Sequence, residues 1–213
     1  MNKIYRSNSL TTADENSRTI SGYAVVFDSW SRDLGGFYEI IRKSAITEEL
    51  LNSSNIIMNT NHNDEQMLAR WVEGSGTLRL ELREDGLYFE FDAPETERGN
   101  ELLWNIRNGN LYECSFCFSL PNNNTCERWY REDGQLKREI TEIGGLYDCS
   151  IVNTAAYPAT SVANREEVDV EAIVRSLDEA EAAEKAAEEE ARKQEVLDAL
   201  NNRLKSFLEK VNI

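Results

Sequence analysis

The chain has 213 residues, of which 39 are acidic and 23 basic, so its formal net charge at neutral pH is −16. This surplus of negative charge argues against binding to nucleic acid or to anionic membranes, because both depend on attraction between phosphate groups and Lys or Arg. We expect protein partners that carry basic patches, and the length allows one good-sized domain with an appendage.

The N-terminal segment, residues 1–18, is polar and lacks the apolar core of an export signal. No stretch approaches the roughly 18 apolar residues that a transmembrane helix needs. The four cysteines are too few and too unevenly spaced for a disulfide framework. We therefore expect thiols and a cytosol-like compartment.

The sequence patterns of residues 19–94 indicate the first part of a mainly β domain. Residues 19–28, TISGYAVVFD, predict a buried strand, whereas residues 35–54 carry apolar residues at helix-like spacing. Leucines and phenylalanines then alternate on either side of Glu-Asp-Gly. This alternation predicts a hairpin over residues 76–94, with one face buried and one charged.

The second half of this region predicts a helix, a loop and further strands. Residues 96–111 favour a short helix that ends at a glycine, and residues 112–120, YECSFCFSL, return to a β pattern. We interpret residues 121–135 as a loop and residues 136–162 as two strands joined at a Gly-Gly pair. The whole region indicates six or seven strands and two short helices, an α+β fold that is mainly β.

The composition changes abruptly after Arg165. Residues 166–213 are rich in Ala, Glu, Leu and Lys, which predicts one long acidic helix. Its last turns carry a heptad-like apolar stripe of Leu197, Leu200, Leu204, Phe207 and Val211. Two interpretations stay open: a solvated helix packed loosely on its own domain, or a helix for oligomerisation or partner docking.

His62 is the only histidine in the chain. Histidine is the usual proton shuttle at neutral pH, so a Ser/His or Cys/His hydrolase would have to use it as the base. Ser115 is one candidate nucleophile, because it lies in a strand directly after a tight Asn-Gly-Asn-Leu turn. A polar surface loop is the structural alternative for His62.

Cysteine chemistry offers two other interpretations. A thiolate at Cys114 or Cys117 would be a strong nucleophile if His62 lay beside it. The Cys-x-x-Cys spacing also resembles half of a zinc site, with Cys126, Cys149 and His62 as further ligands. A strand sends Cys114 and Cys117 to opposite faces, however, so we expect buried thiols and no bound metal.

A histidine base also needs an acceptor that fixes its tautomer, normally a buried carboxylate. Asp148 is the best candidate, since it shares one face of an otherwise apolar strand with Leu146, Ser150 and Val152. Burial of an aspartate is costly unless it is paired. An edge-strand aspartate that faces water remains the alternative at this stage.

Six segments, taken in order, resemble the prohead (capsid maturation) proteases of tailed bacteriophages, a family related in fold to herpesvirus assemblin. They lie within roughly residues 20–165. Their sequences are GYAVVFDSWS, FYEIIRKSAI, NHND, EDGLYFEFDAPET, NGNLYECSFCF and LYDCSIVNTAAYPATSVANR. The last segment is the most specific, because it places a carboxylate two residues before a serine and ends in an alanine/proline turn and an arginine.

The resemblance implies a serine endopeptidase on a closed or partly open β-barrel surrounded by short helices. Its protease domain would occupy residues 19–165, between the polar segment 1–18 and the helical tail 166–213. The residues that match the family pattern are His62 as general base, Ser115 as nucleophile and Asp148 as the acidic member, where relatives often have glutamate. We expect no cofactor.

The same resemblance implies partners and a location. The major capsid protein and the scaffold protein would be substrates, the enzyme would process itself, and self-association would follow the assemblin relatives. It would be made in the host cytoplasm and packaged inside the immature capsid, with the acidic tail as its handle. The alternative is an inactive scaffolding member of the family. Cys117 departs from the small residue, commonly glycine, that the family shows there.

Overall fold

The computed structural model describes residues 11–12, 17–153 and 169–211. The chain forms two compact units, Met1–Glu166 and Glu167–Ile213. The first contains all the strands that are described, and the second is helical. The protein is thus mixed α+β and mainly β, with a C-terminal helix, as its sequence predicts.

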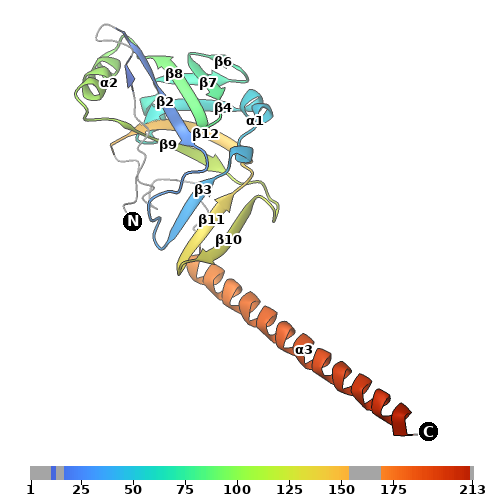
Figure 1. Ribbon diagram of the computed structural model, residues 1–213. Coiled ribbons are helices and arrows are strands. Elements are labelled where there is room, and N and C mark those ends of the chain that lie inside the picture. The colour runs from blue at the N-terminus through green and yellow to red at the C-terminus, as the bar shows by residue number, and fades with distance from the viewer. Residues whose placement is uncertain (1–10, 13–16, 154–168, 212–213) are drawn as a thin grey trace. The chain divides into compact units, whose positions relative to one another are not determined.

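Three sheets make up the described part of the first unit (Figure 1). The four-stranded sheet has the order β1 (Thr11–Thr12), β2 (Thr19–Val26), β8 (Gly86–Asp92) and β7 (Leu78–Leu82). The three-stranded sheet has the order β10 (Glu127–Glu132), β11 (Gln135–Ile140) and β3 (Phe37–Ile41). The five-stranded sheet has the order β6 (Ser75–Gly76), β5 (Ala69–Val72), β4 (Asn55–Thr60), β12 (Gly145–Val152) and β9 (Glu113–Ser119).

The expected β-barrel is wrong. Closure of a barrel requires the end strands of a sheet to pair with each other. Within the described residues each of the three sheets instead keeps two end strands that do not pair, namely β1 and β7, β10 and β3, and β6 and β9. One apolar cluster joins the sheets, and it includes Ile20, Ile41, Ile56, Ile140 and Ile151.

The predicted hairpin is confirmed. β7 and β8 pair antiparallel, with Leu82 opposite Leu87 and Leu78 opposite Phe91. Leu78, Leu87, Phe89 and Phe91 are completely buried. The alternation in sequence therefore places one face of this hairpin in the core, which is the arrangement that stabilises a two-stranded unit.

Two local predictions are wrong. Residues 37–41 form strand β3 and not a helix, because they pair in parallel with β11 and bury Phe37, Ile40 and Ile41. Helix in this region is confined to the 3-10 turn Lys43–Ala45 and to α1, Glu48–Ser53. The segment expected to be a loop contains strand β10, which pairs with β11 around a turn at Asp133 and Gly134.

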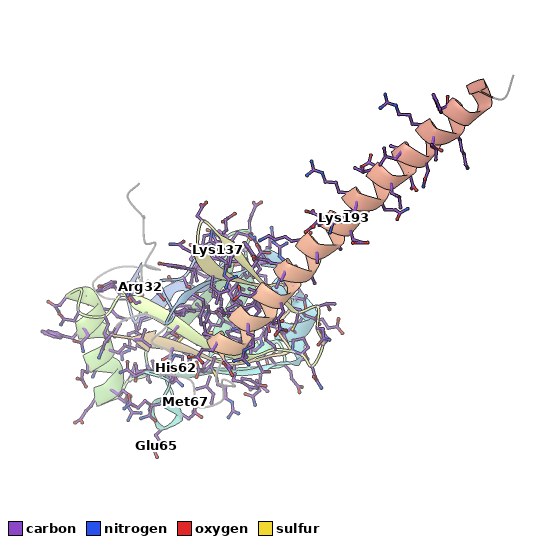
Figure 2. The ribbon with its side chains drawn as sticks, turned by 90° about the horizontal axis from the view of Figure 1, so that it is seen from below. Arg32, His62, Glu65, Met67, Lys137 and Lys193 are labelled. Atoms are coloured by element: carbon purple, nitrogen blue, oxygen red, sulfur yellow. The ribbon has the colours of Figure 1, made fainter. Side chains whose placement is uncertain are left out.

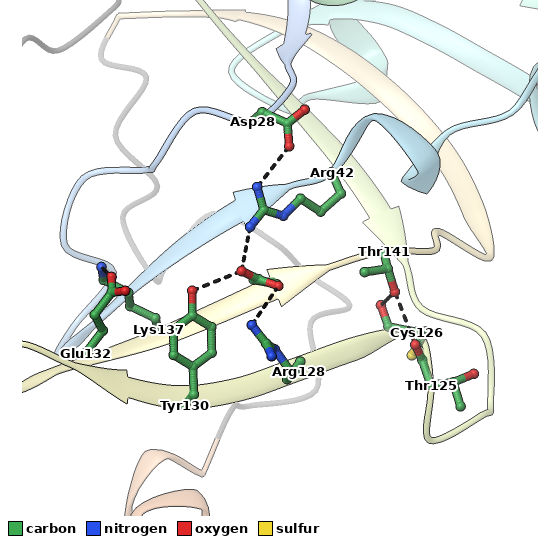
Figure 3. A network of polar contacts seen from close by, with 10 residues as sticks. Asp28, Arg42, Thr125, Cys126, Arg128, Tyr130, Glu132, Lys137 and Thr141 are labelled. Atoms are coloured by element: carbon green, nitrogen blue, oxygen red, sulfur yellow. Dashed lines mark hydrogen bonds and ion pairs between the residues drawn. The ribbon is translucent and has the colours of Figure 1, made fainter.

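Charged side chains hold the three-stranded sheet together (Figure 3). The Glu139 carboxylate accepts hydrogen bonds from Arg42 at 2.5 Å and from the Tyr130 hydroxyl at 2.9 Å, and Arg128 lies 3.3 Å away. Burial raises the pKa of Glu139, but these donors outweigh burial and leave its pKa below the usual value. A polar strand such as β10 is therefore stable without apolar alternation.

The helices α2 and α3 agree with the sequence. α2, Glu97–Arg107, begins with the Thr96 hydroxyl accepting from the Gly99 N–H. α3, Val170–Val211, includes the stripe residues Leu197, Leu200, Leu204 and Phe207, which are between 51% and 62% exposed. The side chain of Val211 lies outside the described residues. None of the described helices has an apolar stretch long enough to cross a membrane.

Candidate active site

The candidate site lies on three neighbouring strands of the five-stranded sheet. β12 lies between β4, to which it is parallel, and β9, to which it is antiparallel. Ser150 on β12 is directly opposite Ser115 on β9, and Asp148 is opposite Cys117. Because paired residues share a face, the two serines, the aspartate and the thiol project from the same side of the sheet.

His62 reaches this face from the segment that follows β4, which also contains Glu65 and Met67 (Figure 2). Asn61 and His62 both have left-handed backbone angles, with φ of 51° and 53°. Asn and His are among the residues that tolerate this region best. The tight turn returns the chain at once, so that the Asn63 N–H donates to the Thr60 carbonyl at 3.1 Å.

The imidazole of His62 connects Ser115 to Asp148. Its Nε2 is 2.9 Å from the Ser115 Oγ, and its Nδ1 is 2.9 and 3.1 Å from the two carboxylate oxygens of Asp148. The structure thus brings together the three residues that the sequence singled out. The alternatives of a surface-loop histidine and a water-facing aspartate are wrong, since both side chains are only about a tenth exposed, 11% and 10%.

The partners of the ring determine its tautomer. An ionised carboxylate has no proton to donate, so the Nδ1–H of His62 donates to Asp148. In the neutral ring this leaves the lone pair on Nε2, which accepts the Ser115 hydroxyl. The geometry is that of a hydroxyl next to a base whose other nitrogen is held by a carboxylate, the arrangement that generates a serine nucleophile.

The thiols are less suited to chemistry. Cys114 and Cys149 are buried, and burial raises the pKa of both thiols far above neutrality. Cys114 and Cys117 face opposite sides of β9, as predicted, and only Cys117 of the two is partly exposed. Within the described residues no group of His, Cys, Asp or Glu is arranged to hold a metal ion.

One polar residue at the site, Ser150, was placed by the sequence on the face of Asp148 but was given no role there. Ser150 is fully buried, and its Oγ accepts the backbone N–H of His62 at 2.9 Å. The available signal was its position two residues after Asp148, on the same face of one strand.

Comparison with known proteins shows the family to which the chain belongs. A family model described as caudovirus prohead serine protease matches residues 5–174, which is most of the chain. No curated protein and no solved structure matches. The match includes all three strands of the candidate site and the loop that carries His62. The chain belongs to the prohead serine protease family of tailed bacteriophages, a family of serine peptidases that suggests a role in capsid maturation.

Proposed function

We propose that this protein is an active serine endopeptidase in which Ser115 is the nucleophile, His62 the general base and Asp148 the residue that orients the base. The observation that carries the proposal is the continuous contact from the Ser115 Oγ through both ring nitrogens of His62 to the Asp148 carboxylate. Each contact is about 2.9 Å, which is within reach for proton transfer.

The reaction follows from these contacts. As the Ser115 Oγ attacks the carbonyl carbon of a peptide bond, its proton passes to Nε2 of His62. The Asp148 carboxylate stabilises the imidazolium that forms, because its negative charge lies beside Nδ1. When the tetrahedral intermediate breaks its C–N bond, Nε2 returns the proton to the leaving amine. Water, activated by the same imidazole, then hydrolyses the acyl-enzyme and regenerates Ser115.

We further propose that the substrates are the major capsid protein and the scaffold protein inside the immature capsid, and that the enzyme also processes itself. A family that acts in prohead maturation supports this choice of substrates. An enzyme that removes scaffold would have to act after a shell has formed. Packaging within the shell meets that requirement.

Co-expression with the capsid and scaffold proteins tests the proposal. Intact-mass measurement should find shortened capsid and scaffold chains with the wild type and full-length chains with Ser115→Ala. Ser119→Ala is a matched control, because Ser119 lies on the same strand and face but contacts Tyr147 at 2.9 Å. Cleavage by Ser115→Ala would refute the assignment of the nucleophile. Full-length products with the wild type would favour the inactive scaffolding alternative.

The tail supports a separate proposal, that α3 recruits the enzyme into the assembling shell or mediates self-association. Four residues of its apolar stripe, Leu197, Leu200, Leu204 and Phe207, are exposed, and a solvated helix would gain nothing from them. A chain that ends at Arg165 should then still cleave its substrates when mixed with them but be absent from purified procapsids. Normal packaging of that truncated chain would contradict this role.

A further inference from the structure

Ser150 contacts His62 at a point that the reaction itself does not use. It lies two residues after Asp148 on the same face of β12, and it is 0% exposed. Asp148 accepts from the ring of His62, whereas Ser150 accepts from its backbone N–H at 2.9 Å. One face of one strand therefore holds both the side chain and the main chain of the histidine.

The main chain of His62 needs such support. Asn61 and His62 are consecutive left-handed residues, a conformation that is disfavoured for residues with a Cβ and persists only where its surroundings impose it. The Asn61 N–H is held by the Ile151 carbonyl at 3.1 Å, and the His62 N–H by the Ser150 hydroxyl. The first contact joins two backbone groups and does not depend on the Ser150 side chain, but the second does.

The register of the sheet makes this contact relevant to the nucleophile. Ser150 is the direct partner of Ser115 across β12 and β9. The residue that anchors the backbone of His62 is thus tied through the sheet to the residue whose proton His62 would accept. A shift of the turn by a fraction of an ångström would change the 2.9 Å separation between Nε2 and Oγ, on which proton transfer depends.

We propose that Ser150 is a positioning residue, which fixes the turn at Asn61 and His62 so that Nε2 stays aligned with the Ser115 hydroxyl. This inference rests on the proposed function of Ser115 and His62. It assigns no proton transfer to Ser150, because its buried Oγ contacts the backbone N–H of His62 and not the imidazole ring.

Three variants test the role of the hydroxyl. The rate at which diisopropyl fluorophosphate phosphorylates Ser115, with loss of fluoride, should fall between about tenfold and a hundredfold in Ser150→Ala, as expected for a misplaced catalytic group. Ser150→Thr keeps the hydroxyl and should restore the rate to within about threefold of the wild type. Ser54→Ala is the matched control, because Ser54 is also a buried serine but caps α1, with its Oγ donating to the Leu50 carbonyl.

A second readout follows the turn directly. The backbone amide of His62 should exchange slowly with deuterium in the wild-type protein, since its N–H is bonded to a buried oxygen, and at least about tenfold faster in Ser150→Ala. The exchange rate of the His62 amide should stay unchanged in Ser54→Ala. A general loss of stability on removing a buried serine would instead raise it in both variants. If Ser150→Ala does not fold, the wild-type measurement alone decides, and rapid exchange of the His62 amide there would overturn the proposal.

The outcomes separate this inference from the proposed function. A wild-type protein that is not phosphorylated by the reagent would refute the activity of Ser115, while slow exchange of the His62 amide would still support the positioning role. If Ser150→Ala is phosphorylated, and its His62 amide exchanges, at the same rates as in the wild type, the positioning role is overturned and the activity of Ser115 is left intact. Equal losses in the Ala and Thr variants would assign the effect to packing and also overturn the proposal.

Discussion

Replacing Asp148 by asparagine keeps the size of the side chain but exchanges one carboxylate oxygen for an amide group that donates. Both oxygens of Asp148 lie close to Nδ1 of His62, at 2.9 and 3.1 Å. An amide group turned toward Nδ1 would donate to it and force the ring proton onto Nε2. That proton would then point at the Ser115 hydroxyl, which the base could no longer deprotonate.

The expected loss is large. Asp148→Asn removes both the tautomer control and the negative charge that stabilises the imidazolium, and in serine proteases this change lowers kcat about 10⁴-fold. The corresponding increase in activation free energy is about 5 kcal/mol. The KM should change little, because Asp148 is buried beneath the ring and contacts no part of a substrate in the proposed reaction.

The assay is the rate of appearance of cleaved capsid protein by intact mass, with Asp92→Asn on the exposed face of β8 as the control for a change of charge. Asp148→Glu keeps the carboxylate acceptor and should therefore retain more activity than Asp148→Asn, although its extra methylene must fit into a buried position. Cleavage by Asp148→Asn within about threefold of the wild type would refute the reasoning, since tautomer control would then be unimportant.

Three further predictions concern thiols and buried charge. Iodoacetamide should modify the partly exposed Cys117 before the buried Cys114, as peptide mapping of the native protein would show; early labelling of Cys114 would contradict the assigned burial. Arg138→Met should lower the free energy of unfolding by about 3 kcal/mol in urea titrations, because it removes the 2.8 Å contact of the buried Glu39; an unchanged midpoint would contradict this. The pKa of Glu139 is lowered in the folded state, so the ionised carboxylate stabilises the protein above its unfolded pKa and this stabilisation is lost as the pH falls. The difference in free energy of unfolding between wild type and Glu139→Gln should therefore narrow below about pH 4. A difference that stays constant with pH would contradict this prediction.

Local sequence patterns were sufficient wherever local contacts determine the structure. The β7–β8 hairpin follows from alternating apolar residues around a glycine turn, and α2 follows from a helical segment that ends at a glycine. β3 was mistaken for helix because its apolar residues suit either period, and its strand form depends on pairing with β11, almost a hundred residues later. β10 was missed because ion pairs hold it in place of apolar alternation.

For the candidate site, too, the sequence predicts single residues, whereas their arrangement depends on long-range contacts. His62 could be singled out by its uniqueness, and Asp148 by its place in an apolar strand. Their proximity depends on the placement of β12 between β4 and β9, a long-range arrangement that no local pattern encodes. The formation of separate sheets, where a barrel was expected, also depends on such long-range strand pairings. Backbone groups that would stabilise an oxyanion leave no mark in the sequence.

The central claim, that His62 activates Ser115, is tested most directly by covalent labelling. Diisopropyl fluorophosphate should add a single adduct to the wild-type protein, and peptide mapping should place it on Ser115. The adduct should be absent in Ser115→Ala and form far more slowly in His62→Ala, because that substitution removes the base that lies 2.9 Å from the hydroxyl. A wild-type protein that stays unlabelled, or labelling that proceeds equally well without His62, would contradict the account.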